Sequence, residues 1–377
     1  MSISLVVMQP TSFCNLACSY CYLPDRSVKG TMSEEVLAHF FRVMFNSQIA
    51  EHCRIVWHAG EPLASGKHFF ESALRIQRQY DHYGSKIEHW IQTNGSLIND
   101  EWCAFFKEND IRISVSLDGP QEMHDHTRKN RKGSGTHAIV AAAIRRLQRW
   151  GVTYNALSVI TRNSLAKPRE YFQSMVDLGI RRVGINIEEL NSQSGSSSMV
   201  QQDAADFEVL KSEYRSFFST LFQLWKDNHQ SFEIREFAQL YRVVNEKVKR
   251  GAFARTSEEH SALDILNIKK NGDVSTFAPE LIESRDGDKD FFVLGNVKHL
   301  SNFESLRATE NFASIETDVK AGIEKCRASC EYFDFCGGGH LSAKYFENGT
   351  LNSAETRYCQ LHRKCMTDVV LAGLGAE

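Results

Sequence analysis

The sequence lacks any apolar run close to the roughly eighteen residues that a transmembrane helix needs. Its start, Met1 to Pro10, lacks the basic beginning and the long apolar stretch of a secretory signal peptide. Positive charge is not in excess either, because 44 Lys and Arg residues face 47 Asp and Glu residues and leave a net charge of -3. We therefore expect a cytoplasmic protein that binds neither a membrane nor nucleic acid, since covering a phosphate backbone takes many unpaired cations.

Cysteine, by contrast, is plentiful and unevenly placed. The 377 residues include ten cysteines, and in a chain without an export signal such clusters indicate metal ligands or catalytic thiols, not disulfides. Cys53 and Cys103 stand alone and are expected to be core thiols. The others form one group near the start and one near the end: Cys14, Cys18 and Cys21, then Cys326, Cys330, Cys336, Cys359 and Cys365. Two metal sites are predicted.

Short β-rich runs alternate with amphipathic helical patterns over the first half of the chain. Thr31 and Glu34 form a capping box before the first helical pattern. Six strands are expected at 4–8, 54–57, 86–92, 111–117, 153–160 and 182–187, each followed by a helix candidate. Six strand–helix rounds predict an α/β fold, a partial (β/α)6 TIM-like barrel, whose chemistry lies on loops at the carboxyl ends of the strands.

The remainder of the chain divides by composition. The polar, Ser-rich stretch 191–199 marks the end of the barrel or a loop. Two long helical patterns follow at 203–227 and 232–250, and then a hairpin with an Asn271-Gly272 turn. The cysteine-rich end is too irregular to form a core without a bound metal. We predict a barrel at 1–200, a helical connector at 201–258 and a metal-binding segment at 259–377.

The first cysteine group has a spacing with a specific chemical use. Cys14-x3-Cys18-x2-Cys21 directly follows the first predicted strand. Three thiolates on one tight loop can hold three irons of a four-iron cubane and leave the fourth iron open to another ligand. Buried thiols or a zinc site are the alternative. With this loop after the first strand of a six-round barrel, the chain resembles the radical S-adenosylmethionine (radical SAM) enzymes, which implies that the open iron chelates the amino and carboxylate groups of that cofactor.

Further segments match positions that bind this cofactor in the family. Ala59-Gly60-Glu61-Pro62 resembles the Gly-Gly-Glu-Pro segment after the second strand, with Ala in place of the first Gly. Glu61 can alternatively cap a helix, Asp118-Gly119 is a common turn, and Arg128 begins a basic run to Lys132. The contacts that the resemblance implies are Tyr20 near the adenine, His58 as a polar contact, Gly60 and Glu61 at the methionine amino group, Ser116 at the ribose and Arg128 at the carboxylate.

The second cysteine group provides four thiolates, enough to complete the coordination of a second four-iron cluster. Gly337-Gly338-Gly339 lets the chain pass close to such a cluster. Zinc also accepts four thiolates and is the alternative here. The arrangement resembles the SPASM extension of peptide-modifying radical enzymes, reduced to one auxiliary cluster, since His340 stands where a further cysteine is expected. The spacing is Cys326-x3-Cys330-x5-Cys336-x22-Cys359, with Cys365 as a fifth candidate.

The resemblance extends to the region that carries the base in the anaerobic sulfatase-maturating enzymes. That base is an aspartate, and Ala278 stands at its position. The stretch from Ser275 to Leu281 is instead similar to the cyclophane-forming peptide maturases of the Grr, Osc and Xye groups. This similarity implies removal of hydrogen from a β-carbon of a ribosomally made precursor peptide, and a bond from that carbon to the ring of an aromatic residue two positions earlier. Glu280 is the candidate base or peptide contact, with a surface carboxylate as its alternative.

Three functions follow from these observations. The first is a cyclophane-forming radical maturase, which Ala278 favours. The second is a radical enzyme of the same build that performs another peptide modification, such as formylglycine formation, thioether formation or epimerisation. The third is a non-enzymatic zinc or iron–sulfur protein. The enzyme hypotheses imply a precursor peptide and an electron donor such as flavodoxin or ferredoxin. Because the first strand begins at about residue 3, no separate amino-terminal peptide-binding domain is expected.

Overall fold

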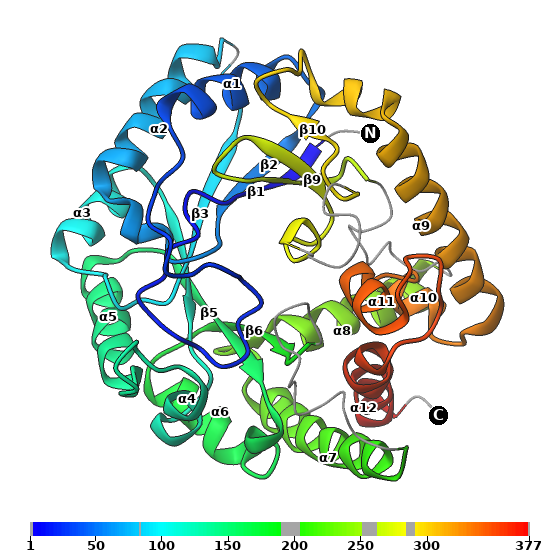
Figure 1. Ribbon diagram of the computed structural model, residues 1–377. Coiled ribbons are helices and arrows are strands. Elements are labelled where there is room, and N and C mark those ends of the chain that lie inside the picture. The colour runs from blue at the N-terminus through cyan, green and yellow to red at the C-terminus, as the bar shows by residue number, and fades with distance from the viewer. Residues whose placement is uncertain (1–2, 83, 190–203, 251–261, 284–290, 376–377) are drawn as a thin grey trace.

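The computed structural model describes residues 3–82, 84–189, 204–250, 262–283 and 291–375. The Ser-rich stretch 191–199 and both predicted domain boundaries, at 200 and 258, lie outside the described residues. In Figure 1, helices α1 to α6 form an arc outside the strands, and helices α9, α11 and α12 close the opposite side of the molecule.

One sheet of ten strands runs through both halves of the chain, in the order β10-β9-β8-β1-β2-β3-β4-β5-β6-β7. Strands β1 to β6 are parallel and follow one another in chain order, as a strand–helix–strand repeat requires. The predicted partial (β/α)6 barrel is therefore confirmed. Its strands are β1 Ile3–Met8, β2 Ile49–Trp57, β3 Ile87–Thr93, β4 Arg112–Ser116, β5 Tyr154–Ile160 and β6 Arg182–Ile187, and the short β7 Glu233–Ile234 pairs parallel with β6.

Helices cover the outer face of these strands. In β3 and β5 every second side chain is buried, because one face of each strand packs under helices and the other borders the barrel interior. Trp57 packs edge to face on Phe69 and Phe70 of the neighbouring helix. Ser33 caps the first helix by accepting from the Val36 amide at 3.2 Å, so the predicted cap at Thr31 is wrong. The helices are α1 Glu34–Phe45, α2 Lys67–Tyr80, α3 Asp100–Glu108, α4 Gln121–Thr127, α5 His137–Trp150 and α6 Pro168–Asp177.

The carboxyl-terminal part is built onto the barrel sheet. Strand β8 (Ile265–Ile268) pairs parallel with β1, and the predicted Asn271-Gly272 turn joins it to antiparallel β9 (Asp273–Thr276). Gly272 has a φ of +94°, a conformation that glycine adopts without strain. The remaining elements are α7 Ala204–Asn228, α8 Arg235–Arg250, β10 Gly295–Asn296, α9 Glu310–Ser329, α10 Phe333–Cys336, α11 Leu341–Asn348, a π-helix Cys359–Lys364, α12 Cys365–Leu374, and 3₁₀ turns at Pro62–Ser65, Arg162–Ser164, Leu281–Glu283 and Phe303–Ala308.

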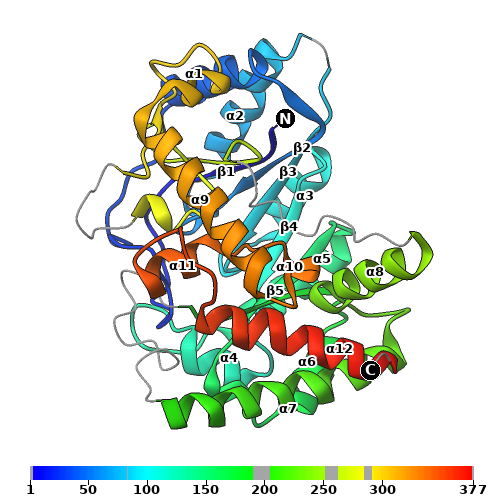
Figure 2. The ribbon, with the colours of Figure 1, turned by 90° about the vertical axis from the view of Figure 1, so that its right-hand side faces the viewer.

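The last helix ties the end of the chain back to the barrel. Figure 2 shows α12 running along α7, and an ion pair of 2.7 Å between Arg215 and Asp368 joins the two helices. Lys226 of α7 also donates to the carbonyl of Gly373 at 2.8 Å. Within the described residues, no helix combines the length and the apolar character needed to cross a membrane.

Candidate active site

The carboxyl ends of β1 to β4 lie at one edge of the sheet, and those of β1, β2 and β4 carry residues that the sequence singled out. The cysteine loop follows β1, Gly60 and Glu61 follow β2, and Ser116 ends β4. Asn94, directly after β3, bridges two of these segments: its amide donates to Asn15 Oδ1 at 2.9 Å and lies 3.7 Å from Cys14 Sγ. The predicted convergence of strand-end loops is therefore present, as expected for a barrel.

The cysteine loop is held in place by a later segment of the chain. The Ser19 amide donates to the carbonyl of Thr127 at 3.0 Å, and the Ala17 amide to that of Lys129 at 2.8 Å. Arg131 donates to the carbonyl of Cys14 through Nε at 2.9 Å and Nη2 at 2.6 Å. Of the three thiols on this loop, that of Cys18 is 9% exposed and the other two are half-buried. Three reachable thiols on a backbone fixed from outside fit the ligand set of an iron–sulfur cluster.

Gly60 lies where the second strand-end loop meets the cysteine loop. A Cβ at this position would lie 2.4 Å from the carbonyl oxygen of Phe13 and 2.7 Å from that of Thr11, and its φ is +57°. Only glycine fits there. Ala59, which replaces a glycine of the family pattern, has a φ of +70°, a conformation that costs an ordinary residue about 1–2 kcal/mol. The substitution is accommodated, but with backbone strain beside the cysteine loop.

Glu61 is completely buried, and its carboxylate serves the protein itself. Oε1 accepts from the Leu63 amide at 3.0 Å and from Thr93 Oγ1 at 2.7 Å, and Oε2 accepts from the Asn94 amide at 2.8 Å. Glu61 thus caps the 3₁₀ turn that follows it, which is the alternative role stated from the sequence. Burial raises the pKa of Glu61 to about 7 although these hydrogen bonds lower it. A cation placed beside this carboxylate would stabilise its charged form.

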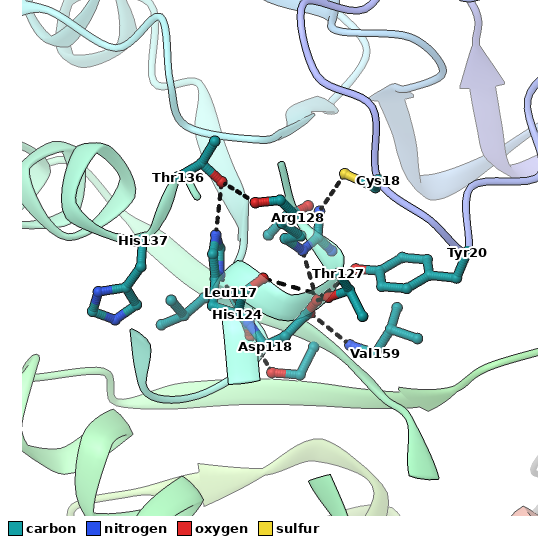
Figure 3. A network of polar contacts seen from close by, with 12 residues as sticks. Cys18, Tyr20, Leu117, Asp118, His124, Thr127, Arg128, Thr136, His137 and Val159 are labelled. Carbon is teal, nitrogen blue, oxygen red and sulfur yellow. Dashed lines mark hydrogen bonds and ion pairs between the residues drawn. The ribbon is translucent and has the colours of Figure 1, made fainter. Parts of the chain in front are cut away.

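Asp118 is a central residue of the site that the sequence did not single out, since it was taken as part of a turn. Its Oδ2 accepts from Tyr20 Oη at 2.6 Å, from Arg128 Nε at 2.8 Å and from Thr127 Oγ1 at 3.3 Å, and its Oδ1 accepts from the Val159 amide at 2.9 Å. Figure 3 shows the aromatic ring, the guanidinium group and the strand amide converging on this carboxylate, which is 2% exposed. The carboxylate therefore joins the cysteine loop, β4, α4 and β5.

Arg128 is buried between this carboxylate and the cysteine loop. Its Nη1 lies 4.0 Å from Cys18 Sγ, and its guanidinium lies 5.3 Å from the centre of the Tyr20 ring. Burial alone would raise the pKa of Asp118, but the charge of Arg128 and the hydrogen bond from Tyr20 lower it overall. A positive charge is therefore fixed beside a cysteine sulfur, at the place where the sequence predicts a cofactor contact.

The other predicted cofactor contacts occupy the same edge. His58 Nε2 lies 3.2 Å from Tyr22 Oη, and burial lowers the pKa of His58 to about 4, so the ring is neutral. Ser116 is 9% exposed and accepts from Gln92 Nε2 at 3.3 Å. Glu280 is half-buried just beyond β9, which runs antiparallel to β8 and so leads away from this edge. The base assigned to Glu280 stays a prediction.

The second cysteine group surrounds a cavity of about 260 Å³. Cys365 is 2% exposed on α12 and is not among the residues that line it. Gly338, with a φ of +83°, brings the chain so near that a Cβ would lie 3.2 Å from the Cβ of Cys326, which is the close approach expected of the glycine run. His340 lines the cavity and stacks on Tyr358, with ring centres 4.1 Å apart. The four cysteines that line the cavity are Cys326, Cys330, Cys336 and Cys359.

A buried lysine beside this cavity needs a negative charge near its ammonium group. Lys344 is 2% exposed, and its Nζ donates to Cys326 Sγ at 3.5 Å. A buried ammonium needs a nearby negative charge, which thiolate ligands of a cluster would provide. In the described part of the chain, no three His, Cys, Asp or Glu side chains are grouped so as to hold a metal ion. Four cysteines spread around a cavity of about 260 Å³, without a grouping among the described residues that could hold one ion, fit a multi-iron cluster better than a single zinc ion.

Comparisons with known proteins agree with this geometry. The sequence model of the radical SAM superfamily matches residues 8–162. An uncharacterised protein of Synechocystis sp. is 35% identical over 98% of this chain and 92% of its own length. The cysteine-type anaerobic sulfatase-maturating enzyme of Clostridium perfringens (strain 13 / Type A) is 27% identical over 89% of this chain and 88% of its own.

Two solved structures share the fold over nearly the whole chain. Native anSMEcpe with bound AdoMet has a TM-score of 0.79 at 25% identity and covers 99% of this chain and 98% of its own. Streptococcus suis SuiB bound to the precursor peptide SuiA has a TM-score of 0.61 at 16% identity, over 95% and 76%. The chain therefore belongs to the radical SAM superfamily, as an enzyme with a SPASM-type carboxyl-terminal extension whose cofactors are a four-iron cluster and S-adenosylmethionine.

Proposed function

We propose that this enzyme modifies a ribosomally made precursor peptide by joining an aromatic ring to the β-carbon of a nearby residue, which makes a three-residue cyclophane. A peptide or protein substrate is supported by the relatives, which include a sulfatase-maturating enzyme and, by fold, a protein solved with its precursor peptide. The choice of crosslink over other peptide chemistry rests on one position, Ala278.

Ala278 stands where the sulfatase-maturating enzymes are expected to carry their catalytic aspartate. Its methyl group is partly buried and packs against the hydrophobic core, and Phe277 before it is 2% exposed. A methyl group cannot accept a proton, so the chain lacks a base at this place. Formylglycine formation needs that base, whereas aromatic crosslinking needs a proton acceptor near the ring. Our candidate for this task is Glu280, two residues further on, although β9 leads away from the strand-end edge before it.

The chain's own residues bind and orient the reacting groups. When bound, the cofactors supply a radical that removes one hydrogen atom from the substrate, and an auxiliary cluster can accept one electron. Cys14, Cys18 and Cys21 would hold the first cluster, and Gly60 allows the backbone to approach it. Glu61 would attract the cofactor's amino group, because a cation there favours the ionised carboxylate.

Three further side chains would complete the cofactor site. Ser116 would reach the ribose, and Tyr20 would lie against the adenine. Arg128 would pair with the cofactor's carboxylate through the nitrogens that Asp118 does not use. Ser116 and Arg128 are at least nine-tenths buried, and Tyr20 donates a hydrogen bond to the buried Asp118. The site is therefore rigid and shields the radical from water.

The auxiliary cavity would hold the second cluster through Cys326, Cys330, Cys336 and Cys359. Lys344 would balance part of the negative charge of the four thiolates. Closing the ring of a cyclophane releases one electron and one proton beyond the first hydrogen atom. A single electron-accepting cluster and a single base satisfy that requirement.

Formylglycine formation is the second candidate, because the named relative at 27% identity and the structure at 25% identity are sulfatase-maturating or anSME proteins. Both chemistries can remove two hydrogens from a peptide, so mass alone does not separate them. An aldehyde reacts with a hydrazide probe and a cyclophane does not. Tandem mass spectrometry also fails to fragment the backbone inside a ring.

The test has two stages. Anaerobic, iron-reconstituted enzyme with S-adenosylmethionine and a strong reductant should form 5′-deoxyadenosine, and Cys18→Ala should not. Each short peptide encoded beside the gene is then co-expressed with the enzyme and analysed by mass spectrometry. A loss of two hydrogens that resists fragmentation and ignores the hydrazide supports the cyclophane. A hydrazide-reactive product from a Ser or Cys peptide would replace it with formylglycine formation.

A further inference from the structure

Positive charge gathers around the cysteine loop although the whole chain carries a net charge of -3. Lys29, Lys129, Arg131 and Lys132 are exposed, and Arg26 is half-buried. The stretches 25–29 and 128–132 that supply these residues contain a single carboxylate, Asp25. We call these five cations the basic rim.

The basic rim touches the backbone of the cluster-binding loop directly. Arg131 donates to the carbonyl of Cys14, and Arg26 Nη1 donates to the carbonyl of Cys18 at 3.0 Å. The carbonyl of Lys129 accepts from the Ala17 amide at 2.8 Å. Leu16 and Asn130 form an antiparallel bridge between the two segments. The outer surface of the cysteine loop is therefore also the surface of the basic rim.

A radical SAM enzyme receives one electron into this cluster in each turnover, from a donor outside the chain. Cys18, Asp118 and Arg128 are buried and Tyr20 is half-buried, so the exposed way for a protein donor to reach the loop is from its outer side. Exposed charges of one sign speed the approach of a partner of the opposite sign and orient it. We propose that the basic rim is the docking surface for an acidic one-electron carrier protein.

The electron balance of this step is simple. One electron leaves the reduced carrier and enters the cluster held by Cys14, Cys18 and Cys21, so the carrier is oxidised by one electron and the cluster is reduced by one. No covalent bond forms or breaks in the transfer. The docking proposal requires the cluster but not the cyclophane chemistry proposed above. Either of these two proposals can therefore fail without affecting the other.

The test reverses rim charges that do not hold the loop. Lys129→Glu and Lys132→Glu each change the charge by two units and leave the Arg26 and Arg131 contacts in place. Arg169→Glu makes the same change at an exposed position of α6 and is the control. The rate of cluster reduction is measured by stopped-flow absorbance with reduced flavodoxin, an acidic carrier, and separately with photoreduced 5-deazariboflavin, a small uncharged reductant.

We expect each rim variant to be reduced roughly 3- to 10-fold more slowly by flavodoxin at low ionic strength, because charge steering contributes factors of about 10 to 1,000 in association rate. The difference should disappear at about 0.5 M salt, where the screening length is only a few ångströms. Reduction by 5-deazariboflavin, and both rates of the Arg169→Glu control, should match the unmodified enzyme. Rim variants that keep the flavodoxin rate, or that slow equally with both reductants, would overturn the proposal.

Discussion

The buried pair of Asp118 and Arg128 predicts a large and pH-dependent loss of stability when only the cation is removed. The two side chains are 2% and 9% exposed and 2.8 Å apart. Arg128→Met keeps most of the side-chain volume but leaves the carboxylate buried with the Tyr20 hydroxyl and the Val159 amide as its remaining strong donors. Breaking a buried pair in this way costs about 3–5 kcal/mol. The equivalent change at exposed Arg169 should cost less than about 0.5 kcal/mol.

The sign of the pH dependence follows from the pKa of Asp118. In the native enzyme burial raises this pKa, but Arg128, together with His124 and the hydrogen bonds from Tyr20 and the Val159 amide, lowers it overall. The pair therefore adds stability above the unfolded-state pKa of about 3.9, which is lost only as the pH falls below it. Without Arg128, burial dominates and the folded-state pKa rises above the unfolded one. The variant should then gain stability as the pH falls from neutral, unlike the native enzyme.

Urea unfolding of the iron-reconstituted proteins, followed by circular dichroism at about pH 5.5 and about pH 8, measures both effects. The double variant Arg128→Met with Asp118→Asn should recover part of the loss, because no charge is left buried without a partner. If Arg128→Met unfolds at the native urea concentration, or if the double variant is the less stable of the two, the electrostatic account of this pair is wrong.

Three further outcomes are expected. Gly60→Ala should lose the iron of the cysteine loop, because the added Cβ would meet two carbonyl oxygens. The control Gly66→Ala also has a positive φ, +82°, but its Cβ would meet open space, so this variant should keep the iron. Equal iron contents in the two variants would contradict this prediction. Cys359→Ala should bind about four fewer irons and Cys365→Ala the native number, as colorimetric iron analysis will show. Lys344→Met should lower the midpoint potential of the auxiliary cluster in an EPR titration, because a positive charge beside the Cys326 sulfur favours the reduced state; an unchanged potential would place the cluster elsewhere.

Periodicity sufficed to predict the barrel. The six strands predicted from β-rich runs and the helices predicted from their apolar faces are present, although β2 begins at Ile49 and not at Arg54; both patterns are local properties of the chain. The seven-residue helix α4 was not predicted, since it is too short to show a period. The capping residue is Ser33 and not the predicted Thr31 for a related reason. Both hydroxyl side chains can cap a helix, and only the geometry of the helix start selects one of them.

The site was predictable only where chemistry depends on spacing along the chain. Three cysteines on one loop, and Gly60 with its neighbour Glu61, are local motifs. The role of Asp118 is not local, because its donors come from Tyr20, Arg128 and Val159, on three other segments. A single aspartate before a glycine gave no sign of this. For Glu61 the sequence offered a cofactor contact and, as the alternative, a helix cap; it did not reveal the hydrogen bonds from Thr93 and Asn94, which come from the segment after β3.

The net charge of the chain also predicts only part of what its surface can bind. A sum of -3 is sound evidence against a partner that demands many cations, yet it averages over faces that differ in sign. The basic rim combines residues 26–29 with residues 129–132, and Arg131 joins these segments by donating to the Arg26 carbonyl and to Ser27 Oγ. Its field therefore depends on a tertiary contact. A chain that is weakly acidic overall can select an acidic partner, provided that its cations lie together at the place where the partner is needed.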